Sequence, residues 1–169
     1  MAPFQCPSKS PVAPKDDFSF AIRQYLPEDH EEVLSIIADG FRSFAPEGHP
    51  LHDFWFNYAQ NSLTDVADVP ENKSTPIVVA TTAVLRKSDS VVELRRVSVK
   101  LEFQRFGLGC MLMSHVHQWA KEQKYAKVFG CTASKRAVKF YDSLGYTFTH
   151  ESVWNADPLV EVDDFEKLL

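Results

Sequence analysis

The residues best suited to chemistry are two glycines at the junction of a strand and a helix. Residues 104–109 read Gln-Arg-Phe-Gly-Leu-Gly, after a β-branched run at 91–99 and before apolar residues at helical spacing. Glycine lets the backbone come close to a ligand. Unpaired amides at a helix start attract anions, helped by the positive end of the helix dipole. The junction is therefore predicted to bind phosphate, although such a pair of glycines can also simply turn the chain.

Two common phosphate motifs do not fit this junction. A Walker loop needs lysine and a hydroxyl residue after Gly109, where Cys110 and Met111 stand. A dinucleotide fingerprint needs a third glycine where Leu112 stands. The remaining pattern, Gln/Arg-x-x-Gly-x-Gly after a strand, resembles the pyrophosphate loop of the GNAT acetyltransferase superfamily, which binds acetyl-CoA.

A second pattern supports the same resemblance. Residues 137–146 read Ala-x-x-Phe-Tyr-x-x-x-Gly-Tyr. The spacing places one apolar stripe on a helix, and Gly145 suits the end of that helix. The run is similar to the second GNAT signature, although taken singly it also fits an ordinary core helix. The two signatures together cover roughly residues 93–148.

The resemblance implies a binding site for acetyl-CoA, with no metal. The backbone of residues 97–99 is expected to hold the acetyl-pantetheine arm as an added strand, with one amide polarising the thioester carbonyl. Loop and helix amides would hold the pyrophosphate, Arg105 would add charge, and Ser134 stands where many relatives present asparagine to CoA. The expected contacts are Val97, Ser98, Val99, Gln104, Arg105, Phe106, Gly107, Leu108, Gly109, Cys110 and Ser134.

The resemblance also implies two catalytic residues. Glu93, eleven residues before Gln104, matches the glutamate that some GNAT enzymes use as the base for the amine. The alternative is an ion pair, because Arg95 lies two positions along on the same strand face. Tyr141 matches the phenol that donates a proton or a hydrogen bond to the developing CoA thiolate, a role that is compatible with a buried core ring. None of the six histidines is selected by the resemblance, and they are expected to be exposed or packed, with lining of the acceptor site as the alternative for His49 and His52.

Three functions follow as hypotheses. The first is N-acetyl transfer to a primary amine of a small molecule or amino acid derivative. The second is a protein lysine or N-terminal acetyltransferase, and the third is an inactive acyl-CoA-binding regulatory module, suggested by the short region before residue 91. A narrower resemblance to the camello-like branch, which includes cysteine S-conjugate N-acetyltransferases, rests on segments 64–68 and 94–102. The apolar membrane segment of that branch is missing here.

Composition narrows the class of protein. The chain has 169 residues, 44% hydrophobic content and a net charge of −5, which favours one folded domain and excludes a general nucleic-acid binder. Three distant cysteines favour a reducing compartment. We find no signal peptide and no apolar run that could span a bilayer. A cytoplasmic protein without membrane insertion is expected, and the oligomeric state stays open between monomer and homodimer.

The element pattern predicts an α/β fold. Residues 1–16 are expected to form a disordered tail, and residues 17–169 one GNAT domain with a mixed sheet and helices on both faces. Within that domain we expect a helix from Pro27, an aromatic helix at 51–58 that is core or lines the acceptor pocket, and helices at 108–119 and 137–144. Strands are expected at 18–23, 77–85, 91–99, 127–132 and 146–154, and residues 160–169 as a strand or a short helix.

Overall fold

The computed structural model describes residues 20–43, 45–54, 77–156 and 159–169. The predicted tail at 1–16, the end of the predicted aromatic helix at 51–58 and the segment 64–68 lie outside these residues. Within them, the predicted α/β fold with a mixed sheet is confirmed.

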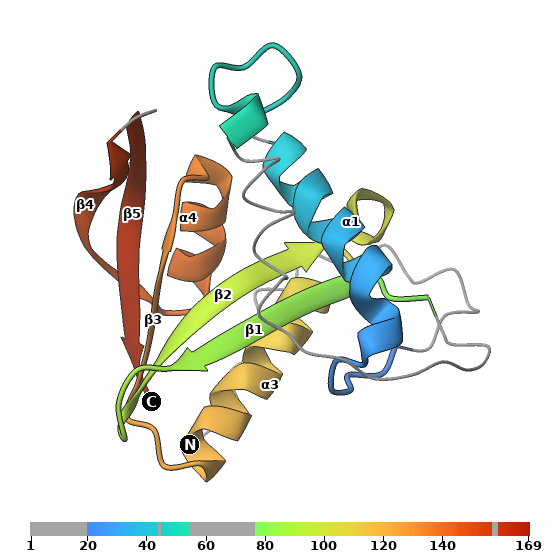
Figure 1. Ribbon diagram of the computed structural model, residues 1–169. Helices are drawn as coiled ribbons and strands as arrows, with labels where there is room; N and C mark the ends of the chain where they lie inside the picture. Colours follow the sequence, from blue (N-terminus) through green and yellow to red (C-terminus); the bar gives the residue numbers. More distant parts are fainter. Residues whose placement is uncertain (1–19, 44, 55–76, 157–158) are drawn as a thin grey trace. The chain divides into compact units, whose positions relative to one another are not determined.

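Five strands form one sheet in the order β1-β2-β3-β5-β4 (Figure 1). β2 runs parallel to β3, whereas β5 is antiparallel to both β3 and β4. The last strand of the chain therefore lies between β3 and β4, which settles the strand-or-helix alternative for its residues. The strands are β1 Ala80–Arg86, β2 Val91–Val99, β3 Lys127–Thr132, β4 Thr147–Ala156 and β5 Leu159–Leu168.

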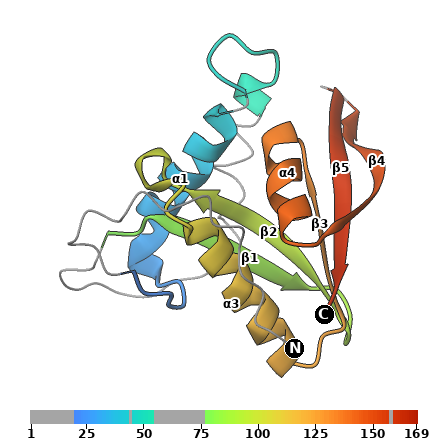
Figure 2. The same ribbon diagram turned by 180° about the vertical axis from the view of Figure 1, so that it is seen from behind.

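The described helices follow the predicted periodicity. They are α1 His30–Arg42, α3 Leu108–Glu122 and α4 Lys135–Ser143, with short 3-10 turns at η1 Pro27–Asp29 and η2 Leu101–Phe103. Seen from behind in Figure 2, α3 and α4 both lie in front of the strands. Among the residues described here, no helix combines the length and apolar character that a bilayer crossing requires.

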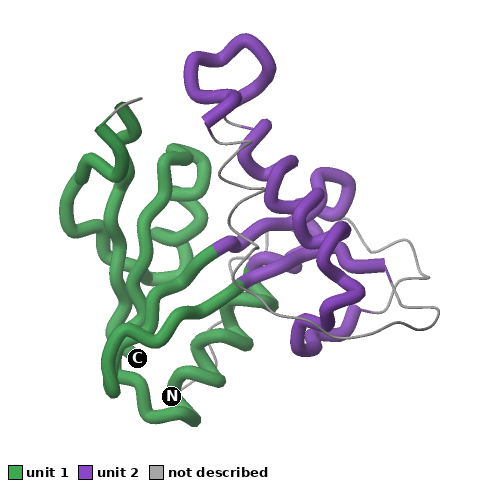
Figure 3. Tube along the Cα trace, in the orientation of Figure 1, with its two compact units in different colours: residues 1–13, 83–95, 110–169 green, residues 14–82, 96–109 purple. Residues whose placement is uncertain are grey.

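The chain divides into two compact units (Figure 3). The described part of the first unit comprises residues 83–95, 110–156 and 159–169, and its core centres on side chains that are almost fully buried. These side chains come from β2, α3, β3 and β5, so one core joins α3 to these three strands. They are Val92, Met113, Val128, Val160 and Phe165.

The second unit, residues 14–82 and 96–109, is built around α1. The helix buries Val33, Ile37 and Ala38, and Val78 packs against this cluster. Gly40 lies within α1, two residues before the helix ends at Arg42. A Cβ at Gly40 would lie 2.6 Å from Ser98 Oγ, so the glycine lets α1 come close to the end of β2.

The strand predicted at 18–23 is wrong for its described part, because residues 20–26 form no strand. Local side-chain contacts hold this segment instead. The Phe20 ring meets Phe103 edge-on, with centroids 6.3 Å apart. The Arg23 guanidinium donates to both carboxylate oxygens of Asp29 at 2.6 Å, and Asp29 also accepts the Leu26 amide at 2.8 Å.

Replacing Asp29 by Asn is expected to lower the free energy of unfolding by about 1–3 kcal/mol at neutral pH, because a charge-assisted bidentate pair is lost. The hydrogen bonds from Arg23 hold the pKa of the buried Asp29 carboxyl below its ordinary value, against the opposing effect of burial. A lowered folded pKa stabilises the fold above the unfolded pKa of ~3.9 and loses that contribution as pH falls through the folded value. Denaturant unfolding at pH 7 and pH 3 should therefore show a smaller difference between wild type and Asp29→Asn in acid. An equal difference at both pH values would contradict this account.

Candidate active site

The glycine loop sits at the start of α3 and belongs to the second unit. Arg105 has φ +70° and Gly107 φ +83°, so the chain twice enters the left-handed region before the helix begins at Leu108. Arg105, Phe106 and Gly107 are exposed, and Leu108 is buried. The first helical amides have no acceptor within their own helix. The loop thus presents an exposed backbone beside a helix N-terminus, as its sequence predicted.

Gln104 has a more local role than the pyrophosphate contact predicted for its amide. Its side-chain Nε2 donates to Val99 O at 3.1 Å, and its backbone amide donates to Leu101 O at 3.2 Å. The side chain therefore ties the loop to the end of β2. The pyrophosphate contact of Gln104 stays a prediction.

The predicted pantetheine-binding residues Val97, Ser98 and Val99 end β2. The register between β2 and β3 pairs Val91–Glu93 with Lys127–Phe129, so these three residues lie beyond it. Arg96, with φ +54°, departs from the extended backbone conformation within β2, just before them. Such an irregularity re-aims the residues that follow it.

Glu93 lies on β2 in the first unit and is ion-paired there. Its carboxylate accepts from Arg95 Nε at 2.9 Å and contacts Lys87 Nζ at 3.1 Å, and its side chain is 16% exposed. Burial would raise the pKa of Glu93, but the hydrogen bonds from Arg95 and Lys87 outweigh it and lower the pKa. The ion pair that competed with the catalytic interpretation is therefore present. It makes Glu93 a weaker base that stays ionised at neutral pH.

Tyr141 is buried on α4, also in the first unit. Its ring stacks on Phe165 with centroids 4.1 Å apart and meets Tyr146 edge-on at 5.5 Å. No hydrogen bond to its hydroxyl is found among the described residues. Burial raises the pKa of Tyr141, so the phenol keeps its proton at any ordinary pH.

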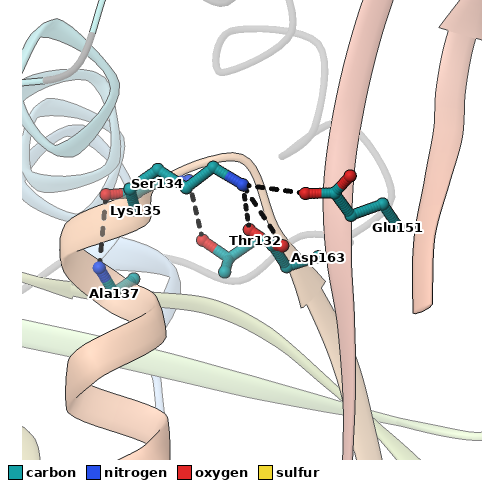
Figure 4. A network of polar contacts seen from close by, with 6 residues as sticks. All are labelled: Thr132, Ser134, Lys135, Ala137, Glu151 and Asp163. Carbon is teal, nitrogen blue, oxygen red and sulfur yellow. Dashed lines mark hydrogen bonds and ion pairs between the residues drawn. The ribbon is translucent and has the colours of Figure 1, made fainter. Parts of the chain in front are cut away.

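Ser134 caps α4 (Figure 4). Its hydroxyl accepts the Ala137 amide at 3.4 Å, and its own amide donates to Thr132 Oγ1 at 3.1 Å. Beside it, Lys135 Nζ bridges Asp163 at 3.0 Å and Glu151 at 3.2 Å. The predicted CoA contact thus also has a local structural task at the helix start.

Sequence reasoning gave no role in the site to two further residues of the first unit. His117 Nε2 and Tyr146 OH lie 2.8 Å apart, and the Tyr146 ring touches that of Tyr141. The sequence does contain a signal that His117 faces the core. Together with Met113, Val116 and Ala120 it follows the i, i+3, i+4, i+7 spacing of the buried face of α3.

A comparison with family models decides the family. The model described as the acetyltransferase (GNAT) domain matches residues 71–159, more than half of the chain. The chain belongs to this family. The GNAT resemblance of the two signatures is thereby confirmed, and the protein is an acyltransferase of that superfamily. No curated protein sequence matches the chain.

Solved structures share the fold at low identity. Ard1 from Thermoplasma volcanium superposes with a TM-score of 0.61 at 16% identity, covering 87% of this chain and 95% of its own. Ribosomal-protein-alanine N-acetyltransferase from Brucella melitensis gives 0.60 at 17%, covering 89% and 100%. A GNAT acetyltransferase from Elizabethkingia anophelis with acetyl-CoA bound gives 0.52 at 18%, covering 57% and 72%. At these identities the likeness establishes the GNAT fold.

Proposed function

We propose that this GNAT protein moves the acetyl group of acetyl-CoA to a primary amine of a small molecule or amino acid derivative. The observation that carries the proposal is the exposed turn before α3, where Gly107 holds a left-handed conformation and the first helical amides follow. Such a turn suits a diphosphate. The structure from Elizabethkingia anophelis carries acetyl-CoA, which supports the same ligand.

In this proposal the cofactor lies along the end of β2 and the loop. The amides from Arg105 to Cys110 bind the pyrophosphate, and Arg105 adds a positive charge. The backbone of Val97–Val99, beyond the register with β3, pairs with the pantetheine arm. The Ser134 hydroxyl donates a hydrogen bond to CoA, while its oxygen continues to accept the Ala137 amide at the start of α4.

The proposed chemistry needs two proton transfers. The amine nitrogen attacks the thioester carbonyl, the carbon–sulfur bond breaks, and the electron pair leaves on sulfur. Glu93 accepts the amine proton directly or through water, and Tyr141 donates its proton to the thiolate. A free alkylamine has a pKa near ~10, so the deprotonation has to be assisted. The ion pairs of Glu93 make it a modest base, and we expect its contribution at the lower end of the usual ~10²–10⁴-fold range.

The narrower camello-like assignment stays a hypothesis from sequence. Neither the matching family model nor the three structures above carries that name. Its Thr-Asp segment, 64–68, lies outside the described residues. The acceptor therefore has to be found by experiment.

A screen of amine acceptors, followed by release of CoA thiol, tests the proposal. We expect turnover with one class of free amines and loss of turnover in Tyr141→Phe. Transfer to peptides but not to free amines would favour the alternative that the protein is a lysine or N-terminal acetyltransferase acting on proteins. Binding of acetyl-CoA without transfer to any amine or peptide would replace the proposal by an inactive acyl-CoA-binding module.

A further inference from the structure

A half-buried histidine and a buried tyrosine contact each other beside the Tyr141 ring. His117 on α3 lies 2.8 Å, Nε2 to OH, from Tyr146, which directly precedes β4 and is 3% exposed. Burial lowers the pKa of His117 to about 4, assisted by the positive charges of Lys167 and Lys121. The imidazole is therefore neutral at working pH. It forms one neutral hydrogen bond with a phenol whose own pKa is raised by burial.

The Tyr146 ring is the neighbour that confines Tyr141 on one side. It meets Tyr141 edge-on at 5.5 Å and 73°, and it meets Phe165 edge-on at 5.2 Å and 84°. Phe165 in turn stacks on Tyr141 at 4.1 Å and 25°. Three rings thus contact one another pairwise. A rotation of the Tyr146 ring would open space beside Tyr141, and the bond to His117 holds Tyr146 at its far end.

Lys167, which lies over the Tyr146 ring, also contacts the chain at the C-terminal end of α4. Lys167 Nζ donates to Leu144 O and lies 5.7 Å from the centre of the Tyr146 ring. The amides of Leu144 and Tyr146 both donate to Tyr141 O, at 3.0 and 3.2 Å. The backbone of Tyr141 is therefore anchored, and its remaining freedom is rotation of the side chain about two torsions.

We propose that His117 and Tyr146 are a positioning pair, which holds the Tyr141 hydroxyl in the direction from which it protonates the leaving thiolate. This inference rests on the proposed function, in which Tyr141 is the proton donor. Neither His117 nor Tyr146 touches the reacting atoms in this account. Their hydrogen bond carries no proton to the substrate and only limits the orientations open to the catalytic ring.

A double-mutant cycle between Tyr146 and Tyr141 separates positioning from a general structural role. Tyr146→Phe keeps the ring and removes only the bond to His117. With acetyl-CoA and the acceptor found in the screen, it is expected to lower kcat about 3–10-fold, the value of one neutral hydrogen bond, and to change KM for acetyl-CoA less than twofold. In the Tyr141→Phe background the same change should alter kcat less than twofold, because the hydroxyl being oriented is gone.

Two histidine variants test the other partner. His117→Leu should reproduce the loss seen in Tyr146→Phe, and the two together should cost no more than either alone. His117→Gln, whose amide can stand near the position of Nε2, should recover most of the rate. Between pH 6 and pH 9 no step in kcat should arise from His117, which faces Tyr146, Lys167 and Lys121 and titrates near pH 4. Tyr125→Phe, in the turn after α3 and against Trp119, is the matched control and should leave kcat unchanged.

The outcomes are distinguishable. If Tyr146→Phe lowers kcat equally in both backgrounds, its effect does not pass through the Tyr141 hydroxyl and the positioning pair is overturned. The same conclusion follows if Tyr146→Phe and His117→Leu leave kcat at the wild-type value while Tyr141→Phe lowers it. If Tyr141→Phe itself has no effect on kcat, the proposed proton donor is wrong, and the positioning inference is overturned with it.

Discussion

Replacing Tyr141 by Phe is expected to lower kcat for acetyl transfer by about 10²-fold or more, the usual contribution of a positioned proton donor. The stability of the fold should hardly change. Phenylalanine keeps the stack on Phe165 and the contact with Tyr146. No described residue loses a hydrogen bond when the hydroxyl is removed. The loss should therefore appear in kcat, with the Kd for acetyl-CoA and the melting temperature close to wild type.

Steady-state thiol release and calorimetric unfolding of the same samples check this expectation. The Tyr125→Phe control removes a phenol of the same size elsewhere in the first unit and should keep full activity. An unchanged kcat in Tyr141→Phe would remove this residue from the mechanism. A matching fall in kcat and in melting temperature would make its role structural.

The second large effect is expected from Gly130→Ala in the middle of β3. A Cβ at Gly130 would lie 2.9 Å from Phe165 Cζ and 3.1 Å from Leu94 O, so a buried ring and a backbone carbonyl would both have to move. Overpacking of this kind costs about 1–3 kcal/mol. We expect the melting temperature to fall by about 2–12 °C. Because Phe165 stacks on Tyr141, kcat should fall as well.

A smaller side chain at position 165 tests the cause of the lost stability. In the Phe165→Leu background, Gly130→Ala should cost less unfolding free energy than in wild type, since the nearest clashing atoms have been removed. Equal costs in the two backgrounds would locate the strain at Leu94 O instead. A Gly130→Ala protein as stable as wild type would contradict the close packing around β3.

Local signals in the sequence predicted most of the elements that carry the site. The bounds of β2 and β3 agree with the structure, because β-branched runs between turn residues are strong signals. The C-terminal end of α4 was equally predictable from Gly145, which has φ +77° in the structure. Glu93 and Arg95 were expected on one strand face, and the ion pair between them confirms that geometry.

The remaining features depend on partners distant in the chain. The apolar alternation at 18–23 resembles a strand, yet in its described part Arg23 and Phe20 are held by Asp29 and Phe103 instead. The place of β5 between β3 and β4 is a matter of tertiary pairing. The bond between His117 and Tyr146 joins residues 29 positions apart, so no local pattern reports it. Sequence periodicity placed His117 on a helix but gave no sign of its partner.

Titration calorimetry with acetyl-CoA and with acetyl-pantetheine, which lacks the diphosphate, tests the central claim most directly. Our account predicts that the full-length protein binds acetyl-CoA, that it binds acetyl-pantetheine at least tenfold more weakly, and that Gly107→Val weakens only the former, because valine is strained at φ +83°. Equal affinity for both ligands, or no heat with millimolar acetyl-CoA, would contradict a diphosphate site at the start of α3.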